Sequence, residues 1–323
     1  MKFFIYFLVV LFSCFVLWSG IVFGQIGGLT KSSQWIDDAY EKKESIAKDI
    51  DGKKVVIVAG SNALFGIDSK LIENAFGVRV VNFGVNAGIE LPLTLFIAKK
   101  VIRDGDTVLM PLEYPMYSYD GTPGVQMIDY VLSREASFFW NLSLYEQFYV
   151  LWHVDIRRVY DGYLARGGVR VSRGVYGAHH IDGYGDQIKT ELKYKEPYMR
   201  SQIKKHILSP ETYGASFDRN ALGWKYLDDF VTWCEGKNVK VIFMPSTLMK
   251  SKSYFDDPKE RWFYENIAKE VRKKGWNYVG KPYEYMFDSS QYFNTNFHLI
   301  NKARKVRTLK MIDDLRKAYG GSI

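Results

Sequence analysis

The sequence contains few cysteines, and this excludes two classes of protein. Cys14 and Cys234 are the only cysteines among 323 residues. A disulfide-based scaffold and a cysteine-rich metal site both need more thiols than this. Because Cys14 stands in an apolar segment, we expect Cys234 to remain a free, buried thiol.

Internal repeats and low-complexity tracts are also absent, and the composition excludes wholesale disorder. Hydrophobic residues make up 47% of the chain and charged residues 25%, which suits one large domain or one domain with an insertion. The net charge of +8 suits nucleic acid, anionic lipid or an anionic polymer. An aromatic content of 16% indicates a surface that meets carbohydrate, lipid or another protein.

Charged residues are missing between Lys2 and Lys31, and this stretch decides the predicted compartment. Residues 3–24 are almost wholly apolar, and about 20 such residues span a bilayer as a helix. Lys2 precedes the stretch, which predicts a cytoplasmic N-terminus and a main domain in the periplasm or at the cell exterior. We therefore expect a single-pass protein in the cell membrane with an uncleaved signal anchor. This location argues against nucleic acid as a partner.

A cleaved signal peptide is the competing interpretation of the same residues. Small residues near Gly24 would then mark the cleavage site. The stretch is long for the apolar region of a signal peptide, and no A-x-A triplet ends it. These two features favour the anchor.

The rest of the chain alternates between strand and helix patterns. Short apolar runs predict strands, and longer amphipathic segments predict helices between them. This rhythm is typical of an α/β fold, a parallel sheet with helices on both faces in three layers. The predicted strands are 55–60, 78–83, 107–112, 239–245 and 276–279, and the predicted helices are 68–76, 91–103, 221–236, 258–274 and 302–319.

We divide the chain into an anchor, a stalk, a split α/β domain and an insertion. Residues 115–215 break the alternation and are rich in tyrosine, glycine and basic residues, so they form the predicted insertion or cap. Within it, the apolar run 138–152 is either a core helix of the insertion or a helix lying on the membrane or on a membrane partner. The predicted boundaries are 1–30 for the anchor, 31–53 for a helical stalk, and 54–114 with 216–323 for the α/β domain.

Polar residues follow the first two predicted strands, where parallel sheets bind ligands. Ser61 stands at a strand-to-helix turn, which is suited to a nucleophile, although a helix-capping turn explains it equally well. Backbone N–H groups of Asn62 and Gly84, with the amide of Asn86, are candidate donors to an oxyanion. Each of them is also an ordinary turn residue.

A second group of polar residues lies after the third strand and before the last helix. His298 is the candidate general base, and Asn294 or Asn296 could hold its tautomer, of which we choose Asn294. Glu113 and Tyr114 are candidates for binding the base or a sugar hydroxyl. The alternatives are that His298 caps the last helix and that Glu113 is a structural carboxylate bonded to backbone amides.

Metal and cofactor chemistry are not expected. The pair His179 and His180 lacks a third ligand at helical or hairpin spacing, and tyrosine and glycine flank it. We therefore interpret these histidines as part of a solvated loop and predict no metal and no cofactor.

Four segments together resemble the SGNH/GDSL hydrolase superfamily. They are VVIVAGSNALFGID from Val55, VVNFGVNAG from Val80, GDTVLMPLEY from Gly105 and YFNTNFHL from Tyr292. The anchor and short stalk make the chain most similar to the membrane-anchored SGNH-like proteins that work beside membrane-bound O-acyltransferases, such as the D-alanyl-lipoteichoic acid transfer protein (DltD) and the alginate acetylation proteins of the AlgJ and AlgX kind. The resemblance covers 54–114 and 220–319, roughly half of the chain.

The sequence departs from the usual pattern of that superfamily at three places. Serine is second rather than third in the segment Gly60–Gly66, where Asn62 takes the third place. In the third segment, GDTVLMPLEY, Glu113 and Tyr114 stand where the superfamily has Asn-Asp. Thr295 replaces the usual acid before His298. The triad therefore lacks its carboxylate unless Glu113 or Asp288 supplies it, and replacing that carboxylate by an amide costs about 10⁴ in rate.

The resemblance implies the transfer of an acyl group, most often acetyl, onto a cell-surface or secreted polysaccharide. A membrane-bound O-acyltransferase and the polysaccharide acceptor are the implied partners. Ser61 would attack the acyl carbonyl, His298 would take its proton and Asn294 would orient His298. The alternatives are a non-catalytic accessory subunit that presents the glycan, or a glycan acetylesterase.

Overall fold

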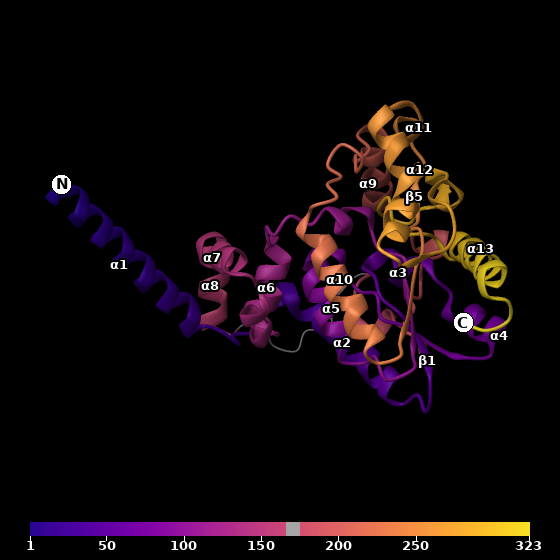
Figure 1. Cartoon of the computed structure of the whole chain (residues 1–323), viewed down its shortest axis with the longest axis horizontal. Coiled ribbons are helices and arrows are strands. Elements are labelled where there is room, and N and C mark those ends of the chain that lie inside the picture. The colour runs from indigo at the N-terminus through magenta and orange to yellow at the C-terminus, as the bar shows by residue number, and fades with distance from the viewer. Residues whose placement is uncertain (166–174) are drawn as a thin grey trace. The chain divides into compact units, whose positions relative to one another are not determined.

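The chain forms two compact units. The computed structural model describes residues 1–165 and 175–323 (Figure 1). One unit combines Met1–Asp37 with Gly121–Ser172, and the other combines Asp38–Asp120 with Arg173–Ile323. These units cut across the predicted boundaries, because the predicted insertion 115–215 contributes to both and the predicted stalk is a helix, α2 (Lys31–Lys48), that both share.

The first unit consists of helices. Its longest is α1 (Lys2–Gly24), which is long and apolar enough to cross a membrane. At 1.5 Å per residue, its 23 residues span about 34 Å. The other helices of this unit are α6 (Val125–Ser133), the 3₁₀ helix η3 (Ala136–Asn141), α7 (Leu144–His153) and α8 (Ile156–Tyr163).

A buried polar cluster joins the end of α1 to α6 and α8. The carboxylate of Asp129 on α6 accepts hydrogen bonds from Thr30 at 2.8 Å, from Ser32 at 2.5 Å and from the guanidinium of Arg158 at 3.1 Å. Arg158 also donates to the side chain of Gln25, just beyond α1. These hydrogen bonds hold the C-terminal end of α1 against the helices that follow.

The second unit is built on a five-stranded parallel sheet of order β2–β1–β3–β4–β6. Its register places Val55 beside Val80 and Thr107, and Thr107 beside Lys240. The core of the sheet is apolar, because Val55, Val56 and Ile57 are fully buried on both faces. The strands are β1 (Lys54–Ile57), β2 (Arg79–Asn82), β3 (Thr107–Met110), β4 (Lys240–Phe243) and β6 (Asn277–Tyr278).

Helices cover both faces of this sheet, as right-handed crossovers require. In Figure 1, α5 (Glu90–Ala98) and α10 (Leu222–Glu235) lie together on one side, and α4 (Ser69–Phe76) and α13 (Asn301–Tyr319) on the other. The remaining helices are α3 (Ser61–Gly66), α9 (Pro197–Leu208), α11 (Ser253–Asp256) and α12 (Pro258–Lys273), and a small parallel pair joins β5 (Leu248–Met249) to β7 (Met286–Phe287).

The predicted α/β class, the parallel sheet and the single N-terminal apolar helix are confirmed. All five predicted strands and all five predicted helices of the α/β domain are present, with most strands shorter than predicted by one to three residues at their ends. The pair β5 and β7 and the short helix α3 were not predicted. Two-residue strands carry too few side chains to show a period.

A buried ion pair fixes the start of β1 to the turn before β3. Lys54 Nζ lies 2.6 Å from Asp106 Oδ2, and both side chains are fully buried. Asp106 also accepts from the backbone N–H groups of Lys54 and Arg103. Burial lowers the pKa of Lys54, and the Asp106 carboxylate opposes that shift.

We expect Asp106→Ala to destabilise the protein by about 3–5 kcal/mol, because it leaves the Lys54 ammonium buried without its partner. Urea unfolding of the full chain in detergent micelles, followed by circular dichroism, measures the change. The double variant Lys54→Met, Asp106→Leu should lose much less stability, since no buried charge remains. Equal losses in the single and double variants would contradict this account of the pair.

Candidate functional site

The candidate residues gather where the strand order of the sheet reverses. From β1 the chain passes to β2 on one side, and from β2 it returns across β1 to β3 on the other. Such a switch point opens a crevice at the carboxyl ends of the strands, the usual ligand site of open α/β sheets. Ser61 begins helix α3 four residues after the last residue of β1, and Glu113 is three residues after the last residue of β3.

The carboxylate of Glu113 bridges the two backbone amides that flank Ser61. Its two oxygens accept hydrogen bonds of 2.9 Å from the N–H groups of Gly60 and Asn62. The side chain is almost fully buried. Of the two interpretations left open for Glu113, the structure therefore gives it the structural one, as the residue that shapes the turn carrying Ser61.

A buried arginine holds the other side of the same turn. Arg307 of α13 donates to the backbone oxygen of Asn62 at 2.9 Å and to its side-chain oxygen at 2.8 Å. The Asn62 amide nitrogen donates in turn to the carbonyl of Pro111, after β3. Burial lowers the pKa of Arg307 to about 10, so the guanidinium stays charged at neutral pH. Asn62, the third residue of the segment Gly60–Gly66, is thus part of the hydrogen-bonded framework that supports the turn carrying Ser61.

Gly84 allows the loops after β1 and β2 to approach closely. A Cβ at this position would lie 2.6 Å from the carbonyl oxygen of Gly60, so only glycine fits. The Gly84 N–H donates to the side chain of Asn82 at 3.1 Å, and its carbonyl accepts from the buried ammonium of Lys43. Burial lowers the pKa of Lys43 to about 7.

These bonds change which groups remain for binding an oxyanion. The N–H groups of Asn62 and Gly84 are both engaged within the protein, so either would have to break a bond to serve. Asn86 accepts from Gly88 through its side-chain oxygen, and for its amide nitrogen no partner is found among the described residues. The Ser61 N–H, as the first of α3, has no acceptor within the helix. Ser61 and Asn86 are therefore the donors that the geometry favours.

Tyr114 lies outside the crevice. Its ring is fully buried and packs edge-on against Phe263 and Tyr264, and its hydroxyl reaches the carbonyl of Ser246 at 3.4 Å. A ring in this position cannot stack on a sugar. Its burial raises the pKa of the phenol well above the ordinary value.

The segment YFNTNFHL, from Tyr292, brings His298 and Asn294 together. Nδ1 of His298 lies 2.7 Å from the side-chain oxygen of Asn294, whose amide nitrogen donates to the hydroxyl of Tyr176 at 2.9 Å. Because an amide oxygen can only accept, Nδ1 carries the proton and Nε2 keeps its lone pair. Burial lowers the pKa of His298 to about 3, so the ring is neutral at physiological pH.

Stacking on Phe65 places the His298 ring over the helix that Ser61 begins. The two rings are parallel within 3°, with centroids 4.0 Å apart. Ser61 and Phe65 are four residues apart in α3, so their side chains share one face of that helix. The structure therefore brings Ser61 and His298 to the same helix face. Among the described residues no hydrogen bond joins their side chains, and no ion pair involves His298.

Sequence reasoning missed three residues of this site. Phe65 supports His298, Tyr176 holds Asn294, and Arg307 holds Asn62. The spacing of Phe65 from Ser61 was a usable signal, since residues four apart on a helix meet the same neighbours. Arg307 gave no signal, because it is one of several basic residues in α13 and nothing in the pattern marks it as buried.

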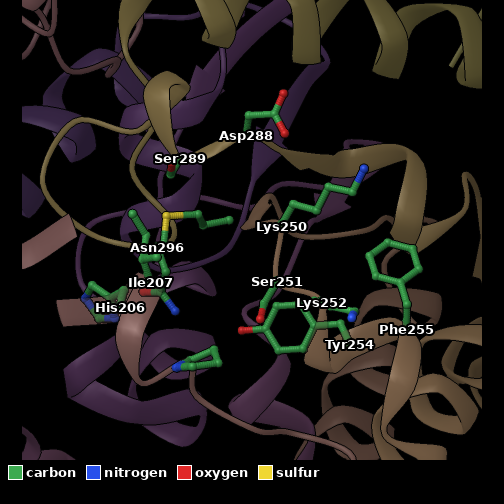
Figure 2. Close-up of a pocket in the computed structure, with 12 residues that line it drawn as sticks. His206, Ile207, Lys250, Ser251, Lys252, Tyr254, Phe255, Asp288, Ser289 and Asn296 are labelled. Carbon is green, nitrogen blue, oxygen red and sulfur yellow. The ribbon is translucent and has the colours of Figure 1, made fainter. Parts of the chain in front are cut away.

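A polar cavity of about 700 Å³ lies beside residues 292–300, the loop before α13 that carries His298 and is called the terminal loop below. Asn296, two residues before His298, lines it together with residues from three other segments, as Figure 2 shows. Asp288, one of the residues considered as the missing acid, also lines this cavity and makes no bond to His298 within the described part of the chain. The polar and aromatic residues around the cavity include His206, Lys250, Ser251, Tyr254, Phe255 and Ser289.

His179 and His180 lie side by side in a short 3₁₀ helix, with ring centroids 4.0 Å apart. Within residues 1–165 and 175–323, no group of three histidine, cysteine or acidic side chains is placed to hold a metal ion. The arrangement thus offers a serine, a neutral imidazole and backbone donors as its chemical groups.

Comparison with known proteins adds no assignment. No protein-family model matches the chain, and neither a curated protein nor a solved structure matches it. The chemistry of this site must therefore be argued from its own geometry.

We expect Glu113→Gln to destabilise the protein by about 2–3 kcal/mol, since a glutamine offers one acceptor where two N–H groups need two, and hydrogen bonds to a charged group are worth about 1.5–3 kcal/mol. Chemical unfolding of the full chain in micelles measures this change. Glu235→Gln, on the exposed end of α10, is the matched control and should change stability little. Equal effects of both substitutions would contradict the bridging role.

We expect the neutral state of His298 to make part of the stability depend on pH. The ordinary pKa of 6.5 falls to about 3 in the folded protein, so between these values the unfolded chain binds the proton better. The contribution is complete above pH 6.5 and is lost as the pH falls toward 3, at about 1.4 kcal/mol for each unit between the two pKa values.

The measurement compares the unfolding free energy of the natural protein and of His298→Gln between pH 3.5 and 7.5. Asp186, whose pKa burial raises to about 6, gives an opposite slope, but it is present in both proteins and cancels in the difference. The difference should shrink steadily as the pH falls. A difference that stays constant would show that His298 has the same pKa in the folded and the unfolded chain.

Proposed function

We propose that the protein transfers an acyl group, most often acetyl, to a polysaccharide outside the cytoplasm, with Ser61 as nucleophile and His298 as general base. The observation that carries the proposal is the state of His298. Its Nδ1 is held by Asn294, its Nε2 lone pair is available, and its ring rests on the helix face that carries Ser61. This is the tautomer that a base for a serine needs.

The proposed reaction has two steps. The Ser61 hydroxyl attacks the acyl carbonyl and gives its proton to Nε2 of His298, and that proton then passes to the leaving group as the acyl–serine ester forms. A sugar hydroxyl next gives its proton to Nε2 and attacks the ester, and His298 returns the proton to the Ser61 oxygen. The Ser61 N–H and the Asn86 amide would stabilise the negative charge that develops on the carbonyl oxygen in both steps.

The polar cavity beside the terminal loop is the proposed acceptor site. The partly exposed ring of Phe255 offers a surface to a sugar ring, and Lys250, Asp288 and Asn296 offer hydrogen bonds to hydroxyl groups (Figure 2). Asn296 connects this cavity to the loop that carries His298. A multipass membrane-bound O-acyltransferase is the proposed source of the acyl group, and it is the partner that the sequence resemblance implies.

Retention of α1 as a membrane anchor is part of the proposal. Trp18 donates to the carbonyl of Leu151 at 2.6 Å, and Phe23 packs edge-on against Phe139, so α1 contributes to the packing of its unit. Gln25 extends the same attachment into the polar cluster around Arg158. Cleavage near Gly24 would remove these partners and expose apolar surface, which favours an anchor over a cleaved signal peptide.

A non-catalytic accessory subunit is the second candidate function. Two observations favour it: the N–H groups of Asn62 and Gly84 are engaged within the protein, and the pKa of His298 is far below the pH at which a general base works best. In this role the crevice and the polar cavity would hold the glycan for a partner enzyme. An experiment on Ser61 separates the two functions.

We expect Ser61→Ala to abolish acylation, at least a hundredfold below the natural protein, because the variant has no nucleophile. The measurement is the acetate released by mild base from the surface polysaccharide of cells that carry each variant. Ser209→Ala, an exposed serine after α9, should leave acetylation unchanged. Undiminished acetylation with Ser61→Ala would exclude the catalytic role and leave the accessory one.

A second experiment, on the purified full chain, separates transfer of the acetyl group from its hydrolysis. With p-nitrophenyl acetate as donor, the full chain in micelles should form a covalent acetyl adduct on Ser61 that mass spectrometry detects. Addition of the acceptor glycan should then move the acetyl group to the glycan. Rapid release of free acetate with no acetylated glycan would identify an esterase.

A further inference from the structure

An apolar stripe runs along the exposed side of α7. Leu144, Phe148 and Trp152 stand four residues apart, so they share one face of the helix. Their exposed fractions are 84%, 50% and 58%. In the same unit, further exposed apolar or aromatic side chains are Trp140, Tyr145, Ile156, Tyr160, Tyr163 and Leu164. Soluble proteins rarely expose a continuous patch of this kind, and where one occurs it marks an interaction site.

The stripe lies beside the apolar surface of α1. Phe148 packs against Phe15, with ring centroids 5.2 Å apart, and Trp18 donates to the carbonyl of Leu151. Further along α1, the Tyr163 hydroxyl of α8 reaches the carbonyl of Ile21, and Trp140 stacks on Phe23. The contacts therefore begin at Phe15 and continue to the outer end of the helix.

These contacts place α7 beside α1 before the C-terminal end of α1, at a depth that lies within the bilayer if α1 spans it. Counted from Lys2 at 1.5 Å per residue, Phe15 lies about 20 Å and Trp18 about 24 Å along the helix, whereas the hydrocarbon core of a bilayer is about 30 Å thick. Phe148 thus meets α1 within the outer leaflet. Tyr163 and Trp140 meet it near the outer interface, where tyrosine and tryptophan concentrate in membrane proteins.

An apolar groove lies between α1 and Trp152 of α7, and along α1 it extends from Phe7 to Trp18. It has a volume of about 360 Å³ and is lined by Phe7, Val10, Leu11, Cys14, Phe15, Trp18 and Trp152. Since all of these side chains are apolar or amphipathic aromatics, the groove suits a lipid acyl chain. The buried polar cluster around Asp129 and Arg158 lies beyond the last turn of α1, outside the apolar region.

We infer that α7 and the start of α8 are immersed in the outer leaflet of the bilayer, with a phospholipid acyl chain in the groove beside α1. This inference rests on the proposal that α1 spans the membrane. We infer a lipid rather than a protein beside α7 because the exposed surface of α7 continues the exposed surface of α1. In a membrane, lipid already surrounds α1 at that depth. Arg157, exposed in the first turn of α8, has a side chain long enough to reach the lipid phosphate groups from there.

Spin labels in lipid nanodiscs test this inference. Single cysteines replace Leu144 or Phe148 in a full chain with Cys14→Ala and Cys234→Ala, reconstituted in phosphatidylcholine and phosphatidylglycerol. Val10→Cys on α1 reports whether the anchor is in the lipid, and Thr232→Cys on the exposed face of α10 is the aqueous control. Power saturation measures the accessibility of each label to oxygen, which concentrates in lipid, and to a water-soluble nickel chelate.

The ratio of oxygen to nickel accessibility should be several-fold higher at 144 and 148 than at 232, and close to the value at 10. A high ratio at 10 with water-like values at 144 and 148 would overturn the immersion of α7 while leaving the anchor in place, and a protein partner would then be the occupant. Water-like values at 10 as well would show that α1 does not span the bilayer. Both the anchor and this inference would then fail.

Discussion

The carboxylate of Glu113 is the interaction on which the candidate site depends. It joins the loop after β3 to the turn after β1, across the point where the strand order reverses, and it holds the amides on both sides of Ser61. A crevice at a switch point is open by default, because its two loops diverge. Here the Glu113 side chain connects the loops and holds the backbone on both sides of Ser61. Arg307 completes this support from α13, through Asn62.

This framework gives a structural role to each residue at which the sequence departs from the hydrolase pattern that it resembles. Asn62 stands in the third place of the first block because its backbone and side-chain oxygens accept from Arg307, a role that serine, with a single side-chain oxygen so close to the backbone, fills less well. Glu113 stands in the third block because it accepts two backbone hydrogen bonds. In the terminal block, Asn294 keeps the tautomer of His298 without adding a charge to a buried ring, and Phe65 supplies the packing. At each of these positions the residue present makes a hydrogen bond within the protein.

The sequence predicted the elements of the α/β unit well, because strands such as 55–60 and 107–112 are continuous apolar runs between turn residues. It predicted the pairing of Asn294 with His298 from their proximity in the chain. It could not predict that Glu113 reaches Gly60, 53 residues away, or that Arg307 is buried, because these contacts depend on how loops from distant strands meet. The unit boundaries differ for the same reason: helices 125–163 pack with α1 through a polar cluster whose members are about 100 residues apart in the chain. Periodicity describes single elements and says nothing of such partners.

A weakly basic imidazole also affects which acyl acceptor the proposed reaction favours. With a pKa of about 3, His298 gives little help to a water molecule that reaches an acyl–serine by diffusion. A sugar hydroxyl held in position gains from its effective concentration, which in well-oriented reactions reaches about 10⁵ M or more. In the proposed reaction, a base without a carboxylate partner would slow hydrolysis and transfer alike, whereas binding of the acceptor would recover the rate of transfer alone. An altered triad of this kind is what a transferase needs when it must keep an acyl–serine intact until its glycan arrives.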